Sequence, residues 1–225
     1  MVFFLSKKIS FPPLNFASKE GLLAVGGDLS CQRLLCAYQN GIFPWYSDGE
    51  PILWWSPDPR LVLYPKEFKI SKTLKKTMRK DKFQITADTA FKQVIMACAK
   101  TRLSKGTGTW ITDEMLNAYC ELYRAGYAHS FEAWFEGRLA GGLYGVALGK
   151  CFFGESMFTL VTDASKVAFA ALVEYLDKYS FSLIDCQISS THLLHFGARE
   201  IPRARFIRQL NTARGKPALK GPWHL

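Results

Sequence analysis

Several features that assign a chain to a special class are absent from this 225-residue sequence. It has no low-complexity tract and no internal repeat, and its longest uninterrupted apolar run, Val167 to Val173, is far shorter than the ~20 residues of a membrane-spanning helix. The apolar start, Met1 to Leu5, is followed at once by Lys7 and Lys8 and lacks the charge order and apolar length of a signal peptide. We therefore expect a soluble protein with no membrane association.

Motifs that bind metals or exchange electrons are also missing. The six cysteines, at positions 31, 36, 98, 120, 151 and 186, include no pair separated by two residues, which is the spacing of zinc and dithiol motifs. His192 and His195 are three residues apart, but no cysteine or carboxylate is spaced to complete a metal site. We predict no metal, no cofactor and reduced cysteines packed as small apolar side chains, which indicates the cytoplasm.

Acidic residues are scarce relative to basic ones: 19 Asp and Glu stand against 29 Lys and Arg, for a net charge of +10. This balance favours a polyanionic partner, with nucleic acid ahead of an anionic membrane surface, and a merely basic surface stays an alternative. The hydrophobic share of 48% and the charged share of 21% are those of a globular chain, and the length allows one large domain or two small ones.

Residues 1–65 are rich in glycine, proline and aromatics, and we assign them to a small N-terminal domain. A short helix over 32–40 is predicted, with Asp28 and Ser30 as candidate caps and Gly41 as its stop signal. Five aromatic residues then lie between Phe43 and Trp55, where prolines and a glycine predict a loop or an irregular strand.

Residues 66–110 form a connecting region that contains a predicted helix over 71–80, opened by Ser71. Leu74 and Met78 share its apolar side, and the opposite side and its extension are cationic. This cationic side consists of Lys72, Lys75, Lys76, Arg79, Lys80 and Lys82. No acidic partner is spaced at i,i+4, so the stripe suits RNA phosphates, while a solvated charged face stays the alternative.

Residues 111–225 show an α+β pattern. An amphipathic helix over 112–126, capped by Thr112, precedes strands predicted at 127–135, 139–147 and 151–159. A helix over 164–179 and a fourth strand over 181–187 follow. Three hairpin-linked strands, a helix and a strand that returns to the sheet match the core order of acetyltransferase-like (GNAT) domains.

The polar residues of the last two strands are candidates for chemistry. Alternation along the fourth strand predicts Asp185 and Gln187 on one face, where they could orient an amine, and Cys186 on the other face. Glu155 follows the apolar pair Phe152-Phe153, so it could be half-buried. Cys186 has no histidine at a useful spacing, and Phe158 breaks a Gly-x-Ser-x-Gly pattern, so neither a cysteine nor a serine nucleophile is supported.

Seven short motifs occur in a fixed order from about residue 11 to 210. They are Gly26-Gly27-Asp28-Leu29, Gly41-Ile-Phe-Pro-Trp45, Trp54-Trp55-Ser56-Pro57-Asp58-Pro59-Arg60, Gly108-Thr-Trp-Ile111, Gly141-Gly-Leu-Tyr-Gly145, Gly154-Glu-Ser-Met-Phe158 and Ile184-Asp-Cys-Gln187. Each motif alone is weak, but together they closely resemble the leucyl/phenylalanyl-tRNA–protein transferases, bacterial enzymes of the N-degron pathway.

The resemblance implies an aminoacyltransferase. It would move Leu, Phe or Met from aminoacyl-tRNA to the N-terminal Arg or Lys of a protein, which marks that protein for degradation. It also implies an acetyltransferase-like C-terminal domain. No heptad seam is present, so we expect a monomer. An acetyl-CoA-dependent N-acetyltransferase is one alternative, although residues 159–165 lack the glycines of a pyrophosphate-binding loop. A non-catalytic RNA-binding module is another.

The resemblance also implies residue roles. Asp185 and Gln187 match the catalytic pair, with Glu155 as a carboxylate beside them. Trp45 and Trp110 match the residues that hold the 3′ adenosine, and Tyr38 and Tyr119 match further site residues. Phe152, Met157 and Ile184 match part of the apolar pocket for the transferred side chain. Leu143 stands where the family often has Met, which could change the pocket's shape. On this basis we expect Asp185 to draw the proton or positive charge from the amine, and Asp185 and Glu155 to make an acidic recess for a cationic acceptor.

Overall fold

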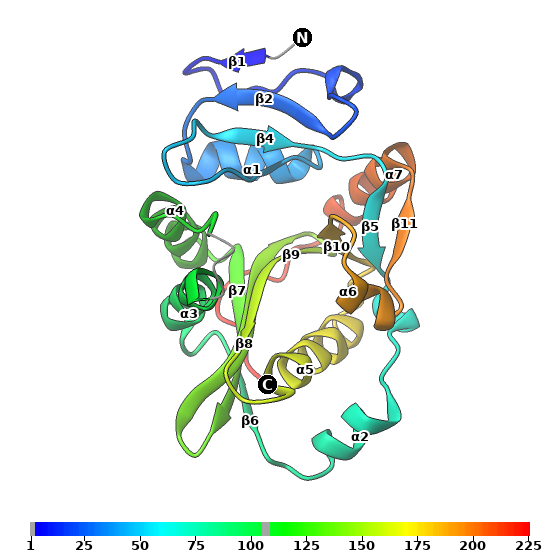
Figure 1. Cartoon of the computed structure of the whole chain (residues 1–225). Helices are drawn as coiled ribbons and strands as arrows, with labels where there is room; N and C mark the ends of the chain where they lie inside the picture. Colours follow the sequence, from blue (N-terminus) through cyan, green and yellow to red (C-terminus); the bar gives the residue numbers. More distant parts are fainter. Residues whose placement is uncertain (1–2, 105–108) are drawn as a thin grey trace.

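The computed structural model describes residues 3–104 and 109–225, in which the chain forms two β-sheets. A four-stranded sheet belongs to the N-terminal unit and a seven-stranded sheet to the larger unit. Figure 1 shows the N-terminal unit seated over one end of the large sheet. Gly108, which opens one of the seven motifs, lies outside the described residues. Within the described ranges no helix is both long and apolar enough to cross a membrane.

The N-terminal unit is a small sheet backed by one helix. Its strand order is β1-β2-β4-β3, with β1 parallel to β2 and the other pairs antiparallel. The Ser30 hydroxyl caps the helix by accepting from the Arg33 amide at 3.3 Å, as predicted. The elements are β1 (Phe3–Leu5), η1 (Leu14–Phe16), β2 (Leu22–Gly26), α1 (Cys31–Gln39), β3 (Phe43–Pro44) and β4 (Leu53–Trp55).

The larger unit is built on a mixed sheet with the order β11-β5-β10-β9-β8-β7-β6. Only β9 and β10 are parallel, and α5 connects them, so the predicted returning strand is confirmed. The strands are β5 (Arg60–Leu63), β6 (Gln84–Ala87), β7 (Ala128–Phe135), β8 (Arg138–Leu148), β9 (Cys151–Thr159), β10 (Leu183–Gln187) and β11 (Arg199–Ile201).

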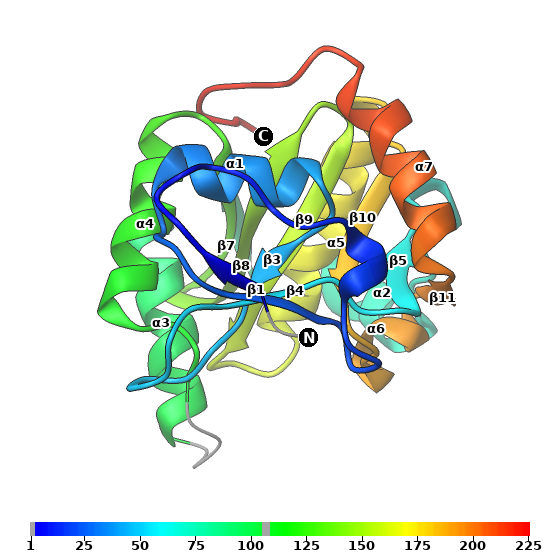
Figure 2. The same cartoon turned by 90° about the horizontal axis from the view of Figure 1, so that it is seen from above.

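Helices cover both faces of this sheet. Figure 1 shows α3 and α4 on one side and α5 on the other, and Figure 2 shows α1 above the end of β8 and β9. The predicted caps are confirmed: the Ser71 hydroxyl accepts from the Leu74 amide at 3.1 Å, and the Thr112 hydroxyl accepts from the Met115 amide at 3.2 Å. The helices are η2 (Pro65–Glu67), α2 (Lys72–Met78), α3 (Phe91–Ser104), α4 (Asp113–Arg124), α5 (Ala164–Lys178), α6 (Thr191–His195) and α7 (Arg203–Arg214).

The α+β class, the small N-terminal unit and the larger mixed-sheet unit are confirmed, but the pairing of strands adds detail that composition did not reveal. Strand β5, at residues 60–63, pairs with β10 and β11, and β6, at residues 84–87, pairs with β7. Both strands thus lie in the large sheet, although the expected boundaries at 65 and 110 put them outside the C-terminal domain. Strands β5, β6 and β11 are four residues or shorter, which gives too few alternating positions for a clear pattern.

Candidate active site

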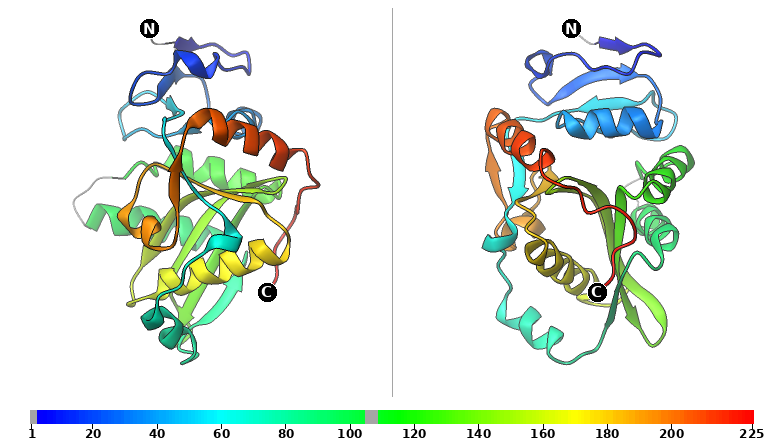
Figure 3. Two further views of the ribbon diagram at one scale, coloured as in Figure 1. Left: turned by 90° about the vertical axis from the view of Figure 1, so that its right-hand side faces the viewer. Right: turned by 180° about the vertical axis from the view of Figure 1, so that it is seen from behind.

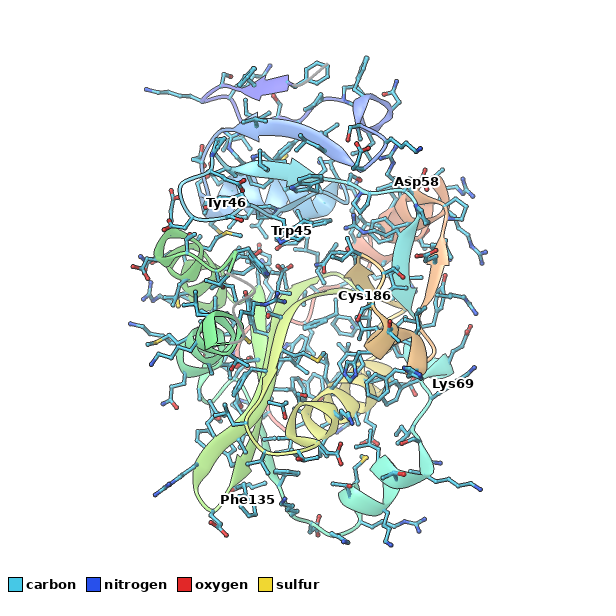
Figure 4. All side chains as sticks on the ribbon, in the orientation of Figure 1. Trp45, Tyr46, Asp58, Lys69, Phe135 and Cys186 are labelled. Atoms are coloured by element: carbon cyan, nitrogen blue, oxygen red, sulfur yellow. The ribbon has the colours of Figure 1, made fainter. Side chains whose placement is uncertain are left out.

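A pocket of about 340 Å³ opens between the N-terminal unit and the ends of β9 and β10. The predicted residues Trp45, Trp110, Glu155 and Gln187 all line it. Figure 4 shows Trp45 at the edge of the N-terminal unit, facing the part of the large sheet that carries Cys186. Residues of both units therefore line the pocket.

Two tryptophans lie at the mouth of this pocket. Trp45 is 41% exposed, and its ring rests on Trp55 with centroids 5.8 Å apart. Trp55 in turn donates from its indole nitrogen to the Trp45 carbonyl oxygen at 2.6 Å. Trp110, three residues before the start of α4, is half-buried and lines the same pocket. These rings offer flat apolar surfaces on which a nucleobase can stack.

The inner part of the pocket is apolar. The predicted residues Phe152, Met157 and Ile184 line it together with Leu143. Phe169 and Leu172 of α5 complete this wall, and sequence analysis did not select them. Their positions three residues apart on an amphipathic helix are typical of core residues, so nothing in the sequence separates them from ordinary packing.

Glu155 is the carboxylate that faces the pocket. Its Oε1 accepts from the Tyr38 hydroxyl at 2.7 Å, and its Oε2 accepts from the Tyr119 hydroxyl at 2.9 Å. Both tyrosines are fully buried on α1 and α4, where their hydroxyls also hydrogen-bond to each other. They lie behind Glu155 rather than on the pocket wall, so they reach the pocket through that carboxylate.

Burial raises the pKa of Glu155 to about 7, although the hydroxyls of Tyr38 and Tyr119 oppose this shift by stabilising the charged form. The carboxylate is consequently close to half-ionised at neutral pH. A group with this pKa can attract a cation or exchange a proton under physiological conditions.

The prediction that Asp185 faces the pocket beside Gln187 is wrong. Asp185 is fully buried, and both of its oxygens accept from Arg60, at 2.8 Å from Nε and at 2.6 Å from the second guanidinium nitrogen. It does not line the pocket, whereas Ile184 and Cys186, on the other face of β10, do. A carboxylate locked in this buried ion pair cannot reach an amine in the pocket.

Gln187 enters the pocket because the strand changes course. The pairing of β10 with β5 shifts between Asp185 and Gln187, and the φ angle of Gln187 is +61°. The Gln187 backbone amide donates to Asp185 Oδ1 at 3.0 Å, which fixes this turn. Its side-chain Nε2 donates to Glu155 Oε1 at 3.2 Å. Because the amide nitrogen is held by the carboxylate, the amide oxygen is the end available to a substrate.

Cys186 lines the pocket but is only 7% exposed. Burial raises the pKa of its thiol, so the nucleophilic thiolate is disfavoured. Within the described part of the chain no three His, Cys, Asp or Glu side chains are grouped to hold a metal ion.

The six basic residues of the predicted cationic stripe are all exposed on and after α2. A chain of contacts relates α2 to the pocket: Thr77 donates to Asp163 at 3.3 Å, and Asp163 pairs with Lys166 at 2.8 Å. Burial, together with the charge of Lys166, lowers the pKa of His192, which lines the pocket.

Sequence comparison agrees with this geometry. A profile described as "Leucyl/phenylalanyl-tRNA protein transferase" matches residues 62–211, and one for the N-terminal domain of the same proteins matches residues 27–58. The chain belongs to the leucyl/phenylalanyl-tRNA–protein transferase family. It is an aminoacyltransferase with an aminoacyl-tRNA donor and a protein acceptor, and neither the acetyl-CoA enzyme nor the non-catalytic RNA-binding module is supported.

Curated relatives of this transferase match over almost their whole length. The protein is 57% identical to the leucyl/phenylalanyl-tRNA–protein transferase of Desulfatibacillum aliphaticivorans over 224 residues, covering 100% of this chain and 96% of that one. It is 54% identical to the transferase of Nitrosomonas europaea over 216 residues, covering 95% and 91%.

Two solved structures show a weak likeness to the transferase. The structure described as L-PGS from Bacillus licheniformis has a TM-score of 0.42 at 9% identity, covering 75% of this chain and 54% of that one. The C-terminal domain of a putative lysylphosphatidylglycerol synthetase from Agrobacterium fabrum has a TM-score of 0.40 at 11% identity, covering 74% and 54%. Scores this low support no conclusion about function.

The raised pKa of Glu155 predicts a pH-dependent cost in stability. The folded state binds the Glu155 proton more tightly than the unfolded chain does. Proton binding therefore stabilises the folded protein fully below pH 4.5, and this stabilisation is lost as the pH rises through about 7. The unfolding free energy of Glu155→Gln minus that of the wild type should therefore rise by about 2 kcal/mol from pH 5 to pH 8, as measured by urea denaturation.

The matched control is Glu174→Gln, at an exposed position on α5, for which the difference should stay flat. A difference for Glu155→Gln that is constant over this pH range would contradict the prediction, because altered hydrogen bonds to Tyr38 and Tyr119 would produce only a constant offset.

Proposed function

We propose that this transferase moves Leu, Phe or Met from aminoacyl-tRNA to the α-amino group of proteins that begin with Arg or Lys, marking them for degradation. The observation that carries the proposal is the Glu155–Gln187 hydrogen bond of 3.2 Å beside an apolar pocket. It puts a hydrogen-bond acceptor for an amine next to space for an uncharged side chain.

The donor end of the tRNA fits the two parts of the pocket. The terminal adenosine stacks at Trp45 and Trp110, and the transferred side chain enters the apolar part formed by Leu143, Phe152 and Met157. An apolar pocket separates side chains by only about 1–3 kcal/mol per methylene. Overlapping use of Leu, Phe and Met follows from this limit.

The reaction itself needs little chemical help because the ester of aminoacyl-tRNA is already activated. The neutral amine nitrogen attacks the ester carbonyl carbon, and the bond to the ribose 3′ oxygen breaks. The nitrogen loses one proton and the departing oxygen gains one, so the step is balanced. A terminal amine has a reference pKa of ~7.7–8.0, so a useful fraction is neutral near pH 7.5.

Gln187 and Glu155 act on the amine in this scheme. The Gln187 amide oxygen accepts a hydrogen bond from the attacking nitrogen and aims its lone pair at the ester. Glu155 holds the Gln187 amide from behind and offsets the positive charge that develops on the nitrogen. Asp185 acts one step further away: it fixes the Gln187 backbone and is a positioning residue rather than a base.

Acceptor selectivity then depends on Glu155 alone, which revises the expected recess of two carboxylates. The charge of Asp185 is compensated by Arg60, and its oxygens are buried. The ionised Glu155 carboxylate remains to attract the cationic side chain of an N-terminal Arg or Lys. All of these groups come from one chain, which fits action as a monomer, and the tRNA donor fits action in the cytoplasm.

Labelling of short peptides tests this proposal. With radiolabelled Leu-tRNA, peptides that begin with Arg or Lys should be labelled, and the same Arg peptide with an acetylated N-terminus should not. The preference for Arg over Ala as the first residue should fall several-fold in Glu155→Gln, because a carboxylate contact is replaced by a neutral one. Equal labelling of the Ala peptide by the wild type would contradict the proposed acceptor.

The cationic stripe of α2 predicts a salt effect on tRNA binding. Replacing Lys75, Lys76 and Arg79 by Ala should weaken binding and reduce the slope of log affinity against log salt by about two units. The matched control replaces Lys7, Lys8 and Lys19, which are equally exposed but lie on the N-terminal unit. An unchanged slope in the α2 variant would refute contact between this stripe and phosphates.

A further inference from the structure

The segment after α7 carries a cluster that the proposed reaction does not use. Residues 215–225 form no helix or strand, and Figure 3 shows this segment running from α7 across the molecule toward α5. Near its end Trp223 is only 1% exposed. A fully buried tryptophan in an irregular terminal segment indicates a specific packing role, because such segments are otherwise poorly ordered.

Polar contacts fix Trp223 in place. Its backbone amide donates to Asp88 Oδ2 at 2.7 Å, and the same carboxylate accepts from the Ser130 amide at 2.8 Å and contacts His129 Nδ1 at 2.8 Å. The His129 ring stacks on the indole with centroids 3.7 Å apart and an interplanar angle of 9°. Backbone and side chain are thus both held, and the indole has a defined position in the core.

From this position the indole contacts one pocket residue on the sheet and one residue of α5, the helix that contributes to the opposite wall. On the sheet side its ring centroid lies 6.0 Å from that of Phe152, a pocket residue. On the helix side it stacks on Tyr175, with ring centroids 4.9 Å apart, and Tyr175 lies three residues after the pocket residue Leu172 on α5. The indole therefore lies between β9 and α5, next to the inner end of the pocket.

The ring of Phe152 is closely packed, and the residue is only 1% exposed. On β8, a Cβ added to Gly145 would lie 2.5 Å from the Phe152 Cζ, so there is no free space on that side. The indole fills the space beside the ring, with centroids 6.0 Å apart, so a smaller side chain at position 223 would leave the ring room to move. We propose that Trp223 is a positioning residue that sets the depth of the donor pocket by holding Phe152 and α5. This inference rests on the proposed use of the pocket for the transferred side chain.

The test compares two donors in the full-length protein. In Trp223→Leu the Phe152 ring gains room to move away from the pocket, and the pocket deepens. Transfer of the larger Phe side chain should therefore become faster relative to transfer of Leu. The ratio of kcat/KM for Phe-tRNA to that for Leu-tRNA, with one Arg peptide as acceptor, should rise at least fivefold. Trp223→Phe keeps a smaller ring and should raise the ratio about twofold, and it carries the test if the leucine variant does not fold.

The control is Phe83→Leu, in the same apolar cluster but packed on Phe135, with ring centroids 6.1 Å apart, and outside the pocket. It should lower the melting temperature and leave the donor ratio unchanged. Ratios that stay at the wild-type value in both Trp223 variants would overturn the inference. Failure of the wild type to transfer either residue to the Arg peptide would instead overturn the proposed function.

Discussion

The buried ion pair between Arg60 and Asp185 is the contact on which the geometry of the site depends. The Arg60 guanidinium lies between the rings of Phe43 and Phe206, 4.8 and 4.7 Å from their centroids, and both partners of the pair are fully buried. Phe43 belongs to the N-terminal unit and Phe206 to α7. One side chain therefore joins three parts of the fold at the base of the pocket. Removing one member of such a pair typically costs about 3–5 kcal/mol, since the other charge is left buried without a partner.

From this pair outward, each group has a separate task. Asp185 is occupied by Arg60 and fixes the backbone of Gln187, while Glu155 holds the Gln187 side chain and is itself held by Tyr38 and Tyr119. The Gln187 amide, which we propose meets the substrate, is thus restrained from two sides. Such restraint lowers the entropic cost of aligning the amine with the ester, which suits a reaction whose donor is already activated.

Local signals in the sequence predicted much of this structure. Ser30, Ser71 and Thr112 were recognised as caps because capping depends only on neighbouring residues. The partial burial of Glu155 agrees with the expectation from the apolar pair before it. Asp185 was misplaced because regular alternation fails at the irregular pairing after it, and because its partner Arg60 is 125 residues away. Trp223 also escaped notice, since no pattern in residues 215–225 shows that they enter the core.

The most direct measurement is the pH dependence of single-turnover transfer by Asp185→Asn, with saturating Leu-tRNA and an Arg peptide. Asparagine leaves the Arg60 charge without its partner and lowers stability, but its oxygen can still accept from Arg60 and from the Gln187 amide, which keeps the turn that positions Gln187. The account predicts a lower rate at every pH and a profile with the same shape as that of the wild type, because Asp185 positions Gln187 and exchanges no proton. Loss of the acid limb of the profile in this variant would show that Asp185 is the base and would contradict the account.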